Sequence, residues 1–329
     1  MPVPEPVDRV DVLVVVDNLT DSLSSNPPDV ASEWSAFWSN GRIRPVTGAN
    51  TCCAHHGLSL LITAHRGDAS RTLLFDAGPE GATFVRNCEV LGAALASVDA
   101  VVLSHGHWDH AGGLTDALAA ITSRRNGASV PCYVHPGMFA ERGMTRPGGL
   151  VTPLGPVPAP GALTDAGAEL VVSRAAHWIV DDMFHVSGEI PRVTPYEKGL
   201  PGQVRRDGPE APWEPDPLLI DERSVAVHIR GRGQFVFSAC SHAGIVNVLR
   251  HARSSFPDVP LYGAMGGLHL SGVTEAIIPE TISDLREFGL KMLAPGHCTG
   301  WRAMAAMSQV FGDELVPSAV GKRYAIRGG

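Results

Sequence analysis

The sequence predicts a mixed α/β fold in which two sheets lie face to face with helices outside them, a four-layer αββα sandwich. Two observations support this prediction. Strand-like and helix-like segments alternate along the chain in two successive sets, and each set has a histidine-bearing loop directly after a strand. The first strand, residues 10–16, is a continuous apolar run, which is typical of a strand buried on both faces. We treat residues 1–329 as a single domain.

The first set of elements occupies the N-terminal half of the chain. Residues 57–64 and 72–76 are predicted to pair as strands, because Arg66-Gly67-Asp68 between them suits a turn. A strand at 100–104 ends directly on His105, so the loop that follows lies at the carboxyl end of a buried strand. The remaining elements of this set are helices at 84–95 and 114–122 and a strand at 132–135.

The second set begins at residue 224. Strands at 224–229 and 234–240 are joined through Gly231-Arg232-Gly233, which again suits a turn. The chain then alternates between helices and strands, and the last of these strands stops just before His297. These elements are a helix at 243–254, a strand at 261–265, a helix at 279–288 and a strand at 291–294.

A proline-rich excursion separates the two sets at about residues 136–217. It holds 13 of the 26 prolines, several of them in the run 153–160. Proline removes a backbone donor and fixes φ, so regular structure is expected to be sparse here. A surface excursion or linker and a lid over an active site both suit this composition. We predict that the excursion crosses the rim of the site and that residues 187–192 contact it.

An aromatic stretch precedes the first histidine-bearing loop. Trp34, Phe37 and Trp38 have the spacing of a short amphipathic helix. Such a helix either packs on the body of the protein or covers a pocket.

Composition excludes several classes of protein. The net charge is −8 and the chain has no run of Lys or Arg, which argues against nucleic-acid binding. No apolar stretch approaches the roughly 18–20 residues of a membrane span, and the N-terminus lacks the features of a secretory signal. We therefore expect a soluble, cytoplasmic protein. Its six cysteines include no Cys-x-x-Cys pair, so free thiols are expected.

The segment at residues 104–113 carries the main chemical signal. It reads Ser-His-Gly-His-Trp-Asp-His-Ala-Gly-Gly and begins at the end of a buried strand, where α/β proteins build sites. His105 and His107 are two residues apart, so they can share one side of an extended backbone. Asp109 and His110 follow as the chain turns into the next helix. Four candidate ligands within six residues would be costly to bury together without a cation.

These residues resemble the signature of a known superfamily. The pattern His-x-His-x-Asp-His-x-Gly-Gly strongly resembles that of the metallo-β-lactamase superfamily, and segments 73–78 and 295–297 resemble two further motifs of it. Other segments resemble one branch, the metal-dependent hydrolases grouped with dihydropterin–ribofuranosylaminobenzene phosphate synthase. Those segments are 17–18, 56–59, 187–192, 239–245 and 265–270. The motifs are spread over nearly the whole chain.

The resemblance implies a metallo-β-lactamase-like αββα sandwich with one or two metal ions in the cleft between its halves. Carried over residue by residue, it assigns His105 and His107 to one metal and Asp109 and His110 to a second. His297 matches the late histidine that also serves the second metal.

The chain departs from the superfamily pattern at two points. The usual mid-chain histidine motif is missing, and Ser187-Gly188-Glu189 stands at its place. The usual bridging aspartate is also missing, and Ser241-His242 occupies that strand end. His242 is therefore the best remaining ligand, and the metal that it would serve stays open.

Further residues are candidates for lining the cleft or supporting the ligands. Asp76 resembles an acid that orients a ligating histidine, and His269 suits a structural, substrate-contacting or ligating role. Cys240 and Cys298 flank candidate ligands but are interpreted as small buried thiols. Arg192 and Lys198 suit either binding of an anionic group on the substrate or an ordinary position on the surface. The full set of candidates is His269, Asp76, Glu189, Arg192 and His56.

The candidate ligands predict a metal-dependent hydrolase. A three-histidine site with an open position lowers the pKa of a bound water to about 7. Asp109 is then either the catalytic base or a ligand of the second metal. Imidazole-rich ligation suits zinc, as one or two ions, with manganese and iron as alternatives. We expect such a hydrolase to use metal-activated water on a small ester, lactone, amide or phosphoester.

Two other activities compete with hydrolysis. A synthase or transferase acting on a pterin-like or other phosphorylated heterocycle is the first, because the branch resemblance allows it. An oxygen-reducing di-iron protein on the same fold is the second, but such proteins carry glutamate where His107 stands. The expected partner is a small-molecule substrate rather than nucleic acid or a membrane, and a homo-oligomer is compatible with the sequence. The sequence has no dinucleotide-binding or phosphate-loop fingerprint.

Overall fold

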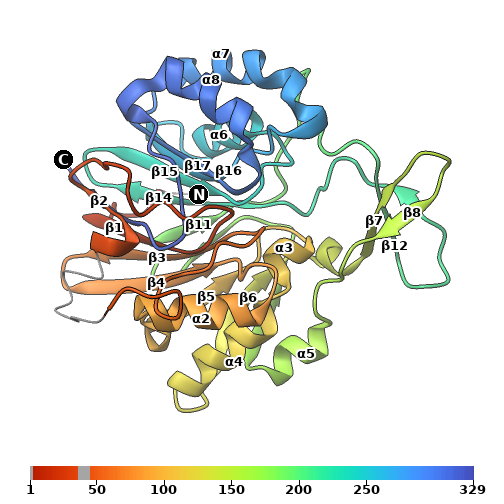
Figure 1. Cartoon of the computed structure of the whole chain (residues 1–329), viewed down its shortest axis with the longest axis horizontal. Helices are drawn as coiled ribbons and strands as arrows, with labels where there is room; N and C mark the ends of the chain where they lie inside the picture. The colour runs from red at the N-terminus through yellow and green to blue at the C-terminus, as the bar shows by residue number, and fades with distance from the viewer. Residues whose placement is uncertain (1–2, 36–44) are drawn as a thin grey trace.

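The computed structural model describes residues 3–35 and 45–329, and Figure 1 shows two large sheets stacked between two groups of helices. Within this part of the chain, the first sheet has eight strands in the order β2-β18-β1-β3-β4-β5-β6-β9. These strands are β1 (Arg9–Val16), β2 (Val30–Ala31), β3 (Ser59–Arg66), β4 (Ala69–Phe75), β5 (Val98–Val102), β6 (Val130–Val134), β9 (Ala168–Val172) and β18 (Arg323–Arg327).

The second sheet has six described strands in the order β10-β11-β14-β15-β16-β17. Their bounds are β10 (His177–Ile179), β11 (Phe184–Val186), β14 (Ser224–Ile229), β15 (Gly233–Ser238), β16 (Leu261–Gly267) and β17 (Met292–Gly296). Strands β15, β16 and β17 run parallel, so their carboxyl ends meet at one edge of this sheet. In the first sheet, β4, β5, β6 and β9 are also parallel.

Helices cover the outer face of each sheet (Figure 1). The first sheet is covered by α2 (Gly81–Leu91), α4 (Leu114–Arg124) and α5 (Pro160–Asp165), and the second by α6 (Ile245–Ser255), α7 (Ile278–Glu287) and α8 (Trp301–Phe311). The short helix α3 (Trp108–Ala111) follows β5. The 3-10 turns are η1 (Leu95–Ser97), η2 (Pro136–Phe139), η3 (Gly272–Ile277), η4 (His297–Thr299) and η5 (Gly312–Glu314).

The layers explain the apolar character of β1. Val12 and Val14 point into the core between the sheets, where they join Phe184 and Phe237 of the second sheet. Val15, on the opposite face, packs in the core beneath the helices of the first sheet. A strand between two packed layers has no face in water, so every position from Val12 to Val16 is apolar. A third core lies between the second sheet and helices α6, α7 and α8.

The predicted α/β fold is confirmed, and the predicted strands and helices on either side of the excursion are present with shifted ends. Helix α8 and strand β18 were not anticipated from the sequence. β18 pairs antiparallel with β1, so the C-terminal segment of the chain lies inside the first sheet. Among the described helices, none is both long and apolar enough to cross a membrane.

The expectation of sparse regular structure in residues 136–217 is wrong. This segment supplies β9 to the first sheet and β10 and β11 to the second. It also forms a separate four-stranded sheet in the order β13-β12-β7-β8, which projects from the body at the right of Figure 1. We call this sheet the arm; its strands are β7 (Glu141–Thr145), β8 (Val151–Pro153), β12 (Gln203–Arg206) and β13 (Glu214–Pro215).

Four prolines of this segment occupy positions that need no backbone donor. Pro136 and Pro160 stand in the first turns of η2 and α5, where the N–H has no partner within the helix. Pro153 ends β8, and Pro215 lies in β13 at the edge of the arm. The proline content therefore marked element ends and edges rather than an absence of structure.

Candidate metal centre

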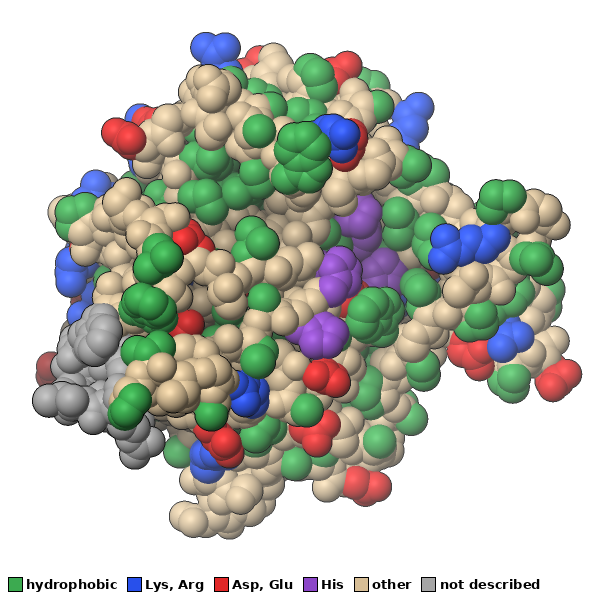
Figure 2. Space-filling model, viewed as in Figure 1, with side chains coloured by type: hydrophobic (Ala, Val, Ile, Leu, Met, Phe, Trp, Pro, Cys, Tyr) green, Lys and Arg blue, Asp and Glu red, His purple; other side chains and the backbone are tan. Residues whose placement is uncertain are grey.

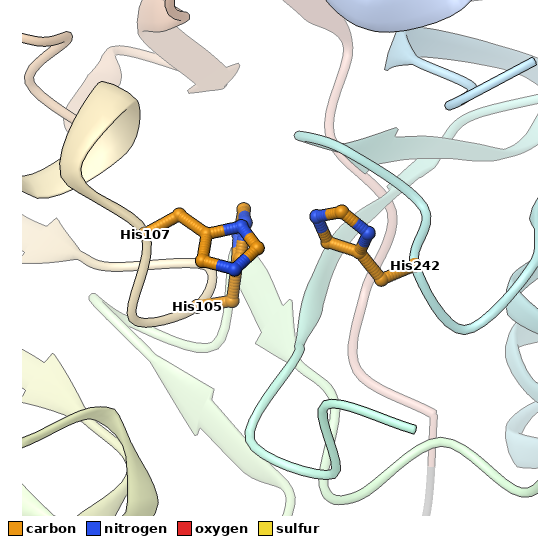
Figure 3. Close-up of side chains that lie close together, drawn as sticks. All are labelled: His105, His107 and His242. Carbon is orange, nitrogen blue, oxygen red and sulfur yellow. The ribbon is translucent and has the colours of Figure 1, made fainter. Parts of the chain in front are cut away.

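The candidate ligands come from both sheets and meet at their shared edge. His105 and His107 lie in the loop after β5, and Asp109 and His110 lie in α3. His242 follows β15, and His297 follows β17. Figure 3 shows the rings of His105, His107 and His242 pointing towards one another from loops on opposite sides.

His105, His107 and His242 form the first ligand group. Their nearest ring nitrogens all lie within 4.8 Å of one another. The ring centroid of His242 lies 4.9 Å from that of His105 and 4.8 Å from that of His107. All three side chains are buried. Three imidazoles at these distances suit one tetrahedral ion with an open fourth position.

Asp109, His110 and His297 form the second group. His297 Nε2 lies 3.2 Å from His110 Nε2 and 3.4 Å from Asp109 Oδ2. His56 adds its Nε2 at 3.3 Å from the same carboxylate oxygen, so it stands beside this group. His56, Asp109 and His297 by themselves have donor atoms within 4.8 Å of one another.

Outer hydrogen bonds assign the protons on the first pair of rings. Ser104 Oγ donates its proton to Asp76 Oδ2 at 2.7 Å. Ser104 Oγ therefore accepts from His105 Nδ1 at 2.9 Å. Gln203 Oε1 accepts from His107 Nε2 at 2.6 Å. These bonds leave His105 Nε2 and His107 Nδ1 unprotonated and only 3.0 Å apart. Two facing lone pairs repel each other unless a cation lies close to both.

The rings of His110 and His297 form a second close pair. His110 Nδ1 donates to Asp76 Oδ2 at 2.7 Å. His297 Nδ1 donates to Asn18 Oδ1 at 3.0 Å, and donation from the Gly57 N–H at 3.0 Å identifies that Asn18 atom as the oxygen. His110 Nε2 is therefore unprotonated, and it faces His297 Nε2 at 3.2 Å.

His242 gives an independent indication of a cation. Both of its ring nitrogens are buried and have no hydrogen-bond partner among the described residues. A buried polar group without a partner costs about 1–3 kcal/mol, so such groups are rare unless something else satisfies them. An ion among the three rings would satisfy His242 and separate the lone pairs of the other two. The residues of this site therefore fit a metal ion.

Electrostatics hold His105, His107, His242 and Asp109 in their metal-binding forms. His297 is the exception, because the neighbouring Cys298 and Asp109 outweigh burial and raise its pKa to about 10. Burial, with a contribution from Arg142, lowers the pKa of His107 to about 4. Burial and the neighbouring rings also hold the pKa values of His105 and His242 well below the usual range. Burial alone would raise the pKa of Asp109, but the surrounding histidines hold it well below its usual value. Neutral imidazoles and an ionised carboxylate are the forms that coordinate metals.

The sequence did not identify several residues that support the candidate ligands. Asp17 Oδ1 accepts from the backbone N–H of His297 at 2.8 Å. Glu222 Oε1 accepts from the backbone N–H of His242 at 2.8 Å, and burial raises the pKa of this carboxyl to about 7. Asp17 and Asn18 follow a buried strand directly, which is a usable signal, whereas Gln203 and Glu222 stand in no motif.

Two thiols also lie at the site, although their sequence positions predicted buried thiols rather than ligands. Cys240 Sγ lies 3.1 Å from Cys298 Sγ and 3.4 Å from His269 Nδ1. Burial raises the pKa of the Cys240 thiol well above its usual value. Donor atoms of Cys240, His297 and Cys298 also lie within 4.8 Å of one another. As predicted, all six cysteines are free.

The remaining candidates divide between the site and other places. His56, His269 and Asp76 lie at the site, as the contacts above describe. Glu189 instead contacts Arg174 and His135, at 2.8 Å and 3.1 Å. Arg192 donates to backbone carbonyls, including that of Leu219 at 3.1 Å. Of the aromatic stretch, Phe37 and Trp38 fall outside the described residues, while Trp34 is half-buried.

A cavity of about 400 Å³ opens over the candidate ligands. Figure 2 shows the histidines gathered in a hollow between the body and the arm. The arm and its connections contribute Met144, Leu154 and Leu200 to the cavity wall, and Trp108 also lines the cavity. Residues 187–192, which were expected to contact the site, are not among those that line this cavity.

Comparisons with known proteins agree with this fold. Residues 71–145 match the model of a β-lactamase superfamily domain. A solved structure of a metal-dependent hydrolase of the β-lactamase superfamily superposes with a TM-score of 0.70 at 19% identity, covering 97% of this chain and 99% of the other. The metallo-β-lactamase fold protein YhfI from Bacillus subtilis superposes with a TM-score of 0.50 at 13% identity, again over 97% and 99%.

The chain therefore has the metallo-β-lactamase fold, as the resemblance predicted, and its residues 71–145 are similar to a β-lactamase superfamily domain. Its relatives include the 7,8-dihydropterin-6-methyl-4-(β-D-ribofuranosyl)-aminobenzene-5′-phosphate synthase of Methanocaldococcus jannaschii. The two sequences are 26% identical over 297 residues, which is 89% of this chain and 92% of the synthase.

Proposed function

We propose that this protein is a metal-dependent hydrolase of a small ester, lactone, amide or phosphoester. The observation that carries the proposal is the pairing of unprotonated imidazole nitrogens, His105 Nε2 with His107 Nδ1, at 3.0 Å beneath an open cavity. A histidine-rich site of this kind suits zinc best, and manganese and iron are alternatives.

Each group of ligands has its own part in this proposal. His105, His107 and His242 would hold one ion, and Asp109, His110 and His297 would hold a second where two are bound. A bound divalent ion supplies Lewis acidity, which activates water and polarises a substrate oxygen. The Asp109 carboxylate lies at the cavity wall, so it is placed to accept a proton from water or to serve the second ion.

The dimensions of the cavity support a small substrate. Its volume of about 400 Å³ lies within the range of small-molecule sites. Met144, Leu154 and Leu200 supply an apolar wall on the side of the arm. We propose that the arm is a lid, because it reaches the cavity with these side chains and reaches His107 with Gln203.

A synthase or transferase acting on a phosphorylated heterocycle is the second candidate function. The similarity to the methanogen synthase over most of both chains favours it. The two candidates differ in what the reaction consumes. A hydrolase needs only water and one substrate, whereas a synthase needs a second organic substrate as acceptor.

A panel of substrates tests the two functions. p-Nitrophenyl esters, lactones and phosphodiesters are assayed with the as-purified protein, with a chelator, and after zinc or manganese is restored. Hydrolysis should vanish with the chelator, return with metal, and rise with pH through an apparent pKa of about 7. His65→Ala, a substitution on β3 outside the cluster, is the matched control and should keep the activity.

Two results would contradict hydrolysis. Turnover that persists with the chelator would remove the metal from the reaction. Turnover that appears only when a second organic substrate is supplied would favour the synthase.

A further inference from the structure

A pair of cysteines lies beside the histidine cluster and has no assigned role in the proposed hydrolysis. Cys240 Sγ and Cys298 Sγ are 3.1 Å apart. Cys240 follows β15 and Cys298 lies in η4 after β17, and β16 runs between these two strands. Both side chains are almost fully buried, yet both line the cavity over the cluster. A small molecule that enters this cavity therefore reaches both sulfur atoms.

The end of β16 makes room for the two thiols to meet. A Cβ atom at Gly267 would lie 2.7 Å from Cys298 Sγ and 2.5 Å from the carbonyl oxygen of Ala239, so only glycine fits between the two loops. The Gly267 N–H donates to that same carbonyl at 3.0 Å, and Ser241 Oγ donates to the Gly267 carbonyl at 2.7 Å. These bonds fix the backbone on both sides of Cys240.

We propose that Cys240 and Cys298 are an oxidant-reactive dithiol, which forms an intramolecular disulfide when a peroxide enters the cavity. A disulfide bond is about 2.0 Å long, so the sulfur atoms need to approach by about 1 Å. Rotation of the two side chains supplies a movement of this size. The sulfur atoms face each other across the cavity wall, whereas the other buried thiols, such as Cys88, lie in the core under the helices of the first sheet.

The reaction proceeds in two balanced steps with hydrogen peroxide as the oxidant. One thiol attacks a peroxide oxygen, the O–O bond breaks, and a sulfenic acid and one water molecule are formed. The second thiol attacks the sulfenic sulfur, the S–O bond breaks, and a second water molecule leaves. In total the two thiols lose two protons and two electrons, and the peroxide is reduced to two water molecules.

The disulfide would change the metal centre next to it. Cys240 Sγ lies 3.8 Å from His297 Nε2, and the new bond would tie the loop that carries His242 to the loop that carries His297. Loops fixed by a disulfide have less freedom to adjust around an ion. We therefore expect the oxidised protein to bind metal more weakly than the reduced protein, and bound metal to slow the oxidation.

Peptide mapping by mass spectrometry tests the proposal on the full chain. Protein treated with a chelator is exposed to an equimolar amount of hydrogen peroxide and then digested without reductant. The expected result is one cross-linked peptide pair that contains Cys240 and Cys298, and its loss after treatment with a dithiol reductant. Cys240→Ser or Cys298→Ser should abolish the cross-link. Cys53→Ser changes an exposed thiol away from the cavity and should leave it in place.

Two results would overturn the proposal. In the first, Cys53 is oxidised while Cys240 and Cys298 stay reduced. In the second, Cys240 and Cys298 each gain oxygen without becoming linked. Both results would be measured on the wild-type protein, so the conclusion does not depend on whether a cysteine variant folds.

Discussion

Gln203 Oε1 accepts a hydrogen bond from His107 Nε2 at 2.6 Å, and this bond joins the arm to the first histidine motif. Gln203 begins β12, so the contact spans 96 positions of sequence and links the proline-rich excursion to the ligand loop. Because the bond holds the proton on Nε2, it keeps Nδ1 of His107 free to face His105.

The first prediction concerns this bond. Gln203→Leu removes the acceptor and should weaken metal binding by about 10–100-fold, the usual effect of losing an outer partner of a ligating histidine. Gln203→Glu keeps an oxygen at the same place and should bind metal almost as well as the wild type. Competition against a chromophoric chelator measures both affinities. Equal affinity in the Leu variant and the wild type would show that the bond does not orient His107.

The second prediction concerns the ligands themselves. His107→Ala and His110→Ala should each lose most of the bound metal, because each removes a donor from one of the two groups. His65→Ala removes a histidine that bonds Asp11 on the first sheet and should retain the full metal content. Elemental analysis of the purified proteins gives the stoichiometry. A double His105/His107 variant that keeps stoichiometric metal would refute the assignment of this site.

Asp76 provides a third test, because it accepts hydrogen bonds from both Ser104 and His110. Its φ is 59°, a left-handed conformation that asparagine also tolerates, so Asp76→Asn should not strain the backbone. We expect the metal affinity to fall by about tenfold or more. Asp99→Asn is the matched control, since Asp99 accepts a backbone N–H, from Thr72 at 2.8 Å, away from the ligands, and the change should leave metal binding unchanged.

The fourth prediction concerns the arm. Met144→Trp should narrow the cavity mouth and raise KM for the bulkier members of a substrate series by about tenfold, with little effect on the smallest. The metal content should not change. Leu150→Trp places the same ring on the same arm at a position that is 73% exposed, and should behave as the wild type. If both variants shift KM equally, the arm does not form the wall that substrates meet.

The fifth prediction concerns stability in acid. Burial lowers the pKa of His185 to about 4 from 6.5 in the unfolded chain, and this ring packs against Trp178 and Phe256. The unfolded protein therefore takes up a proton first as the pH falls. The stability that His185 contributes is present above pH 6.5 and is lost between pH 6.5 and 4, by about 3 kcal/mol in total.

Denaturant titrations at several pH values test this change. In His185→Phe the free energy of unfolding should fall less steeply than in the wild type between pH 6.5 and 4. The difference between the two proteins isolates this histidine from the other groups that titrate. Parallel curves for the two proteins would show that His185 does not contribute.

Much of the fold was predictable from the sequence because each buried strand is a local run of apolar residues. β1 and β5 lie between packed layers, so their composition alone identifies them. β18 is short, and only Tyr-Ala-Ile separates its two terminal arginines, so its apolar run is too brief to identify it as a strand. Its place beside β1 depends on pairing between the first and the last strand of the described chain, which no local pattern specifies.

The candidate site was predictable to the extent that its ligands are clustered along the chain. Residues 105–110 stand in one motif, and His242 and His297 follow strands. The meeting of Cys240 with Cys298 depends on the order of β15, β16 and β17 in the sheet, which no local pattern specifies. The bond from Gln203 depends in the same way on where the arm folds back.

The position of β18 has a consequence for synthesis in the cell. β1 pairs with β18 through Arg9 and Arg327, so one edge of β1 stays open until nearly the whole described chain has left the ribosome. At about 5–20 residues per second, this interval lasts for tens of seconds. An apolar strand with an unpaired edge is a template for aggregation during that time. Nascent chains of this protein should therefore depend on chaperones, and loss of the final strand by premature termination should yield insoluble protein rather than a weakened enzyme.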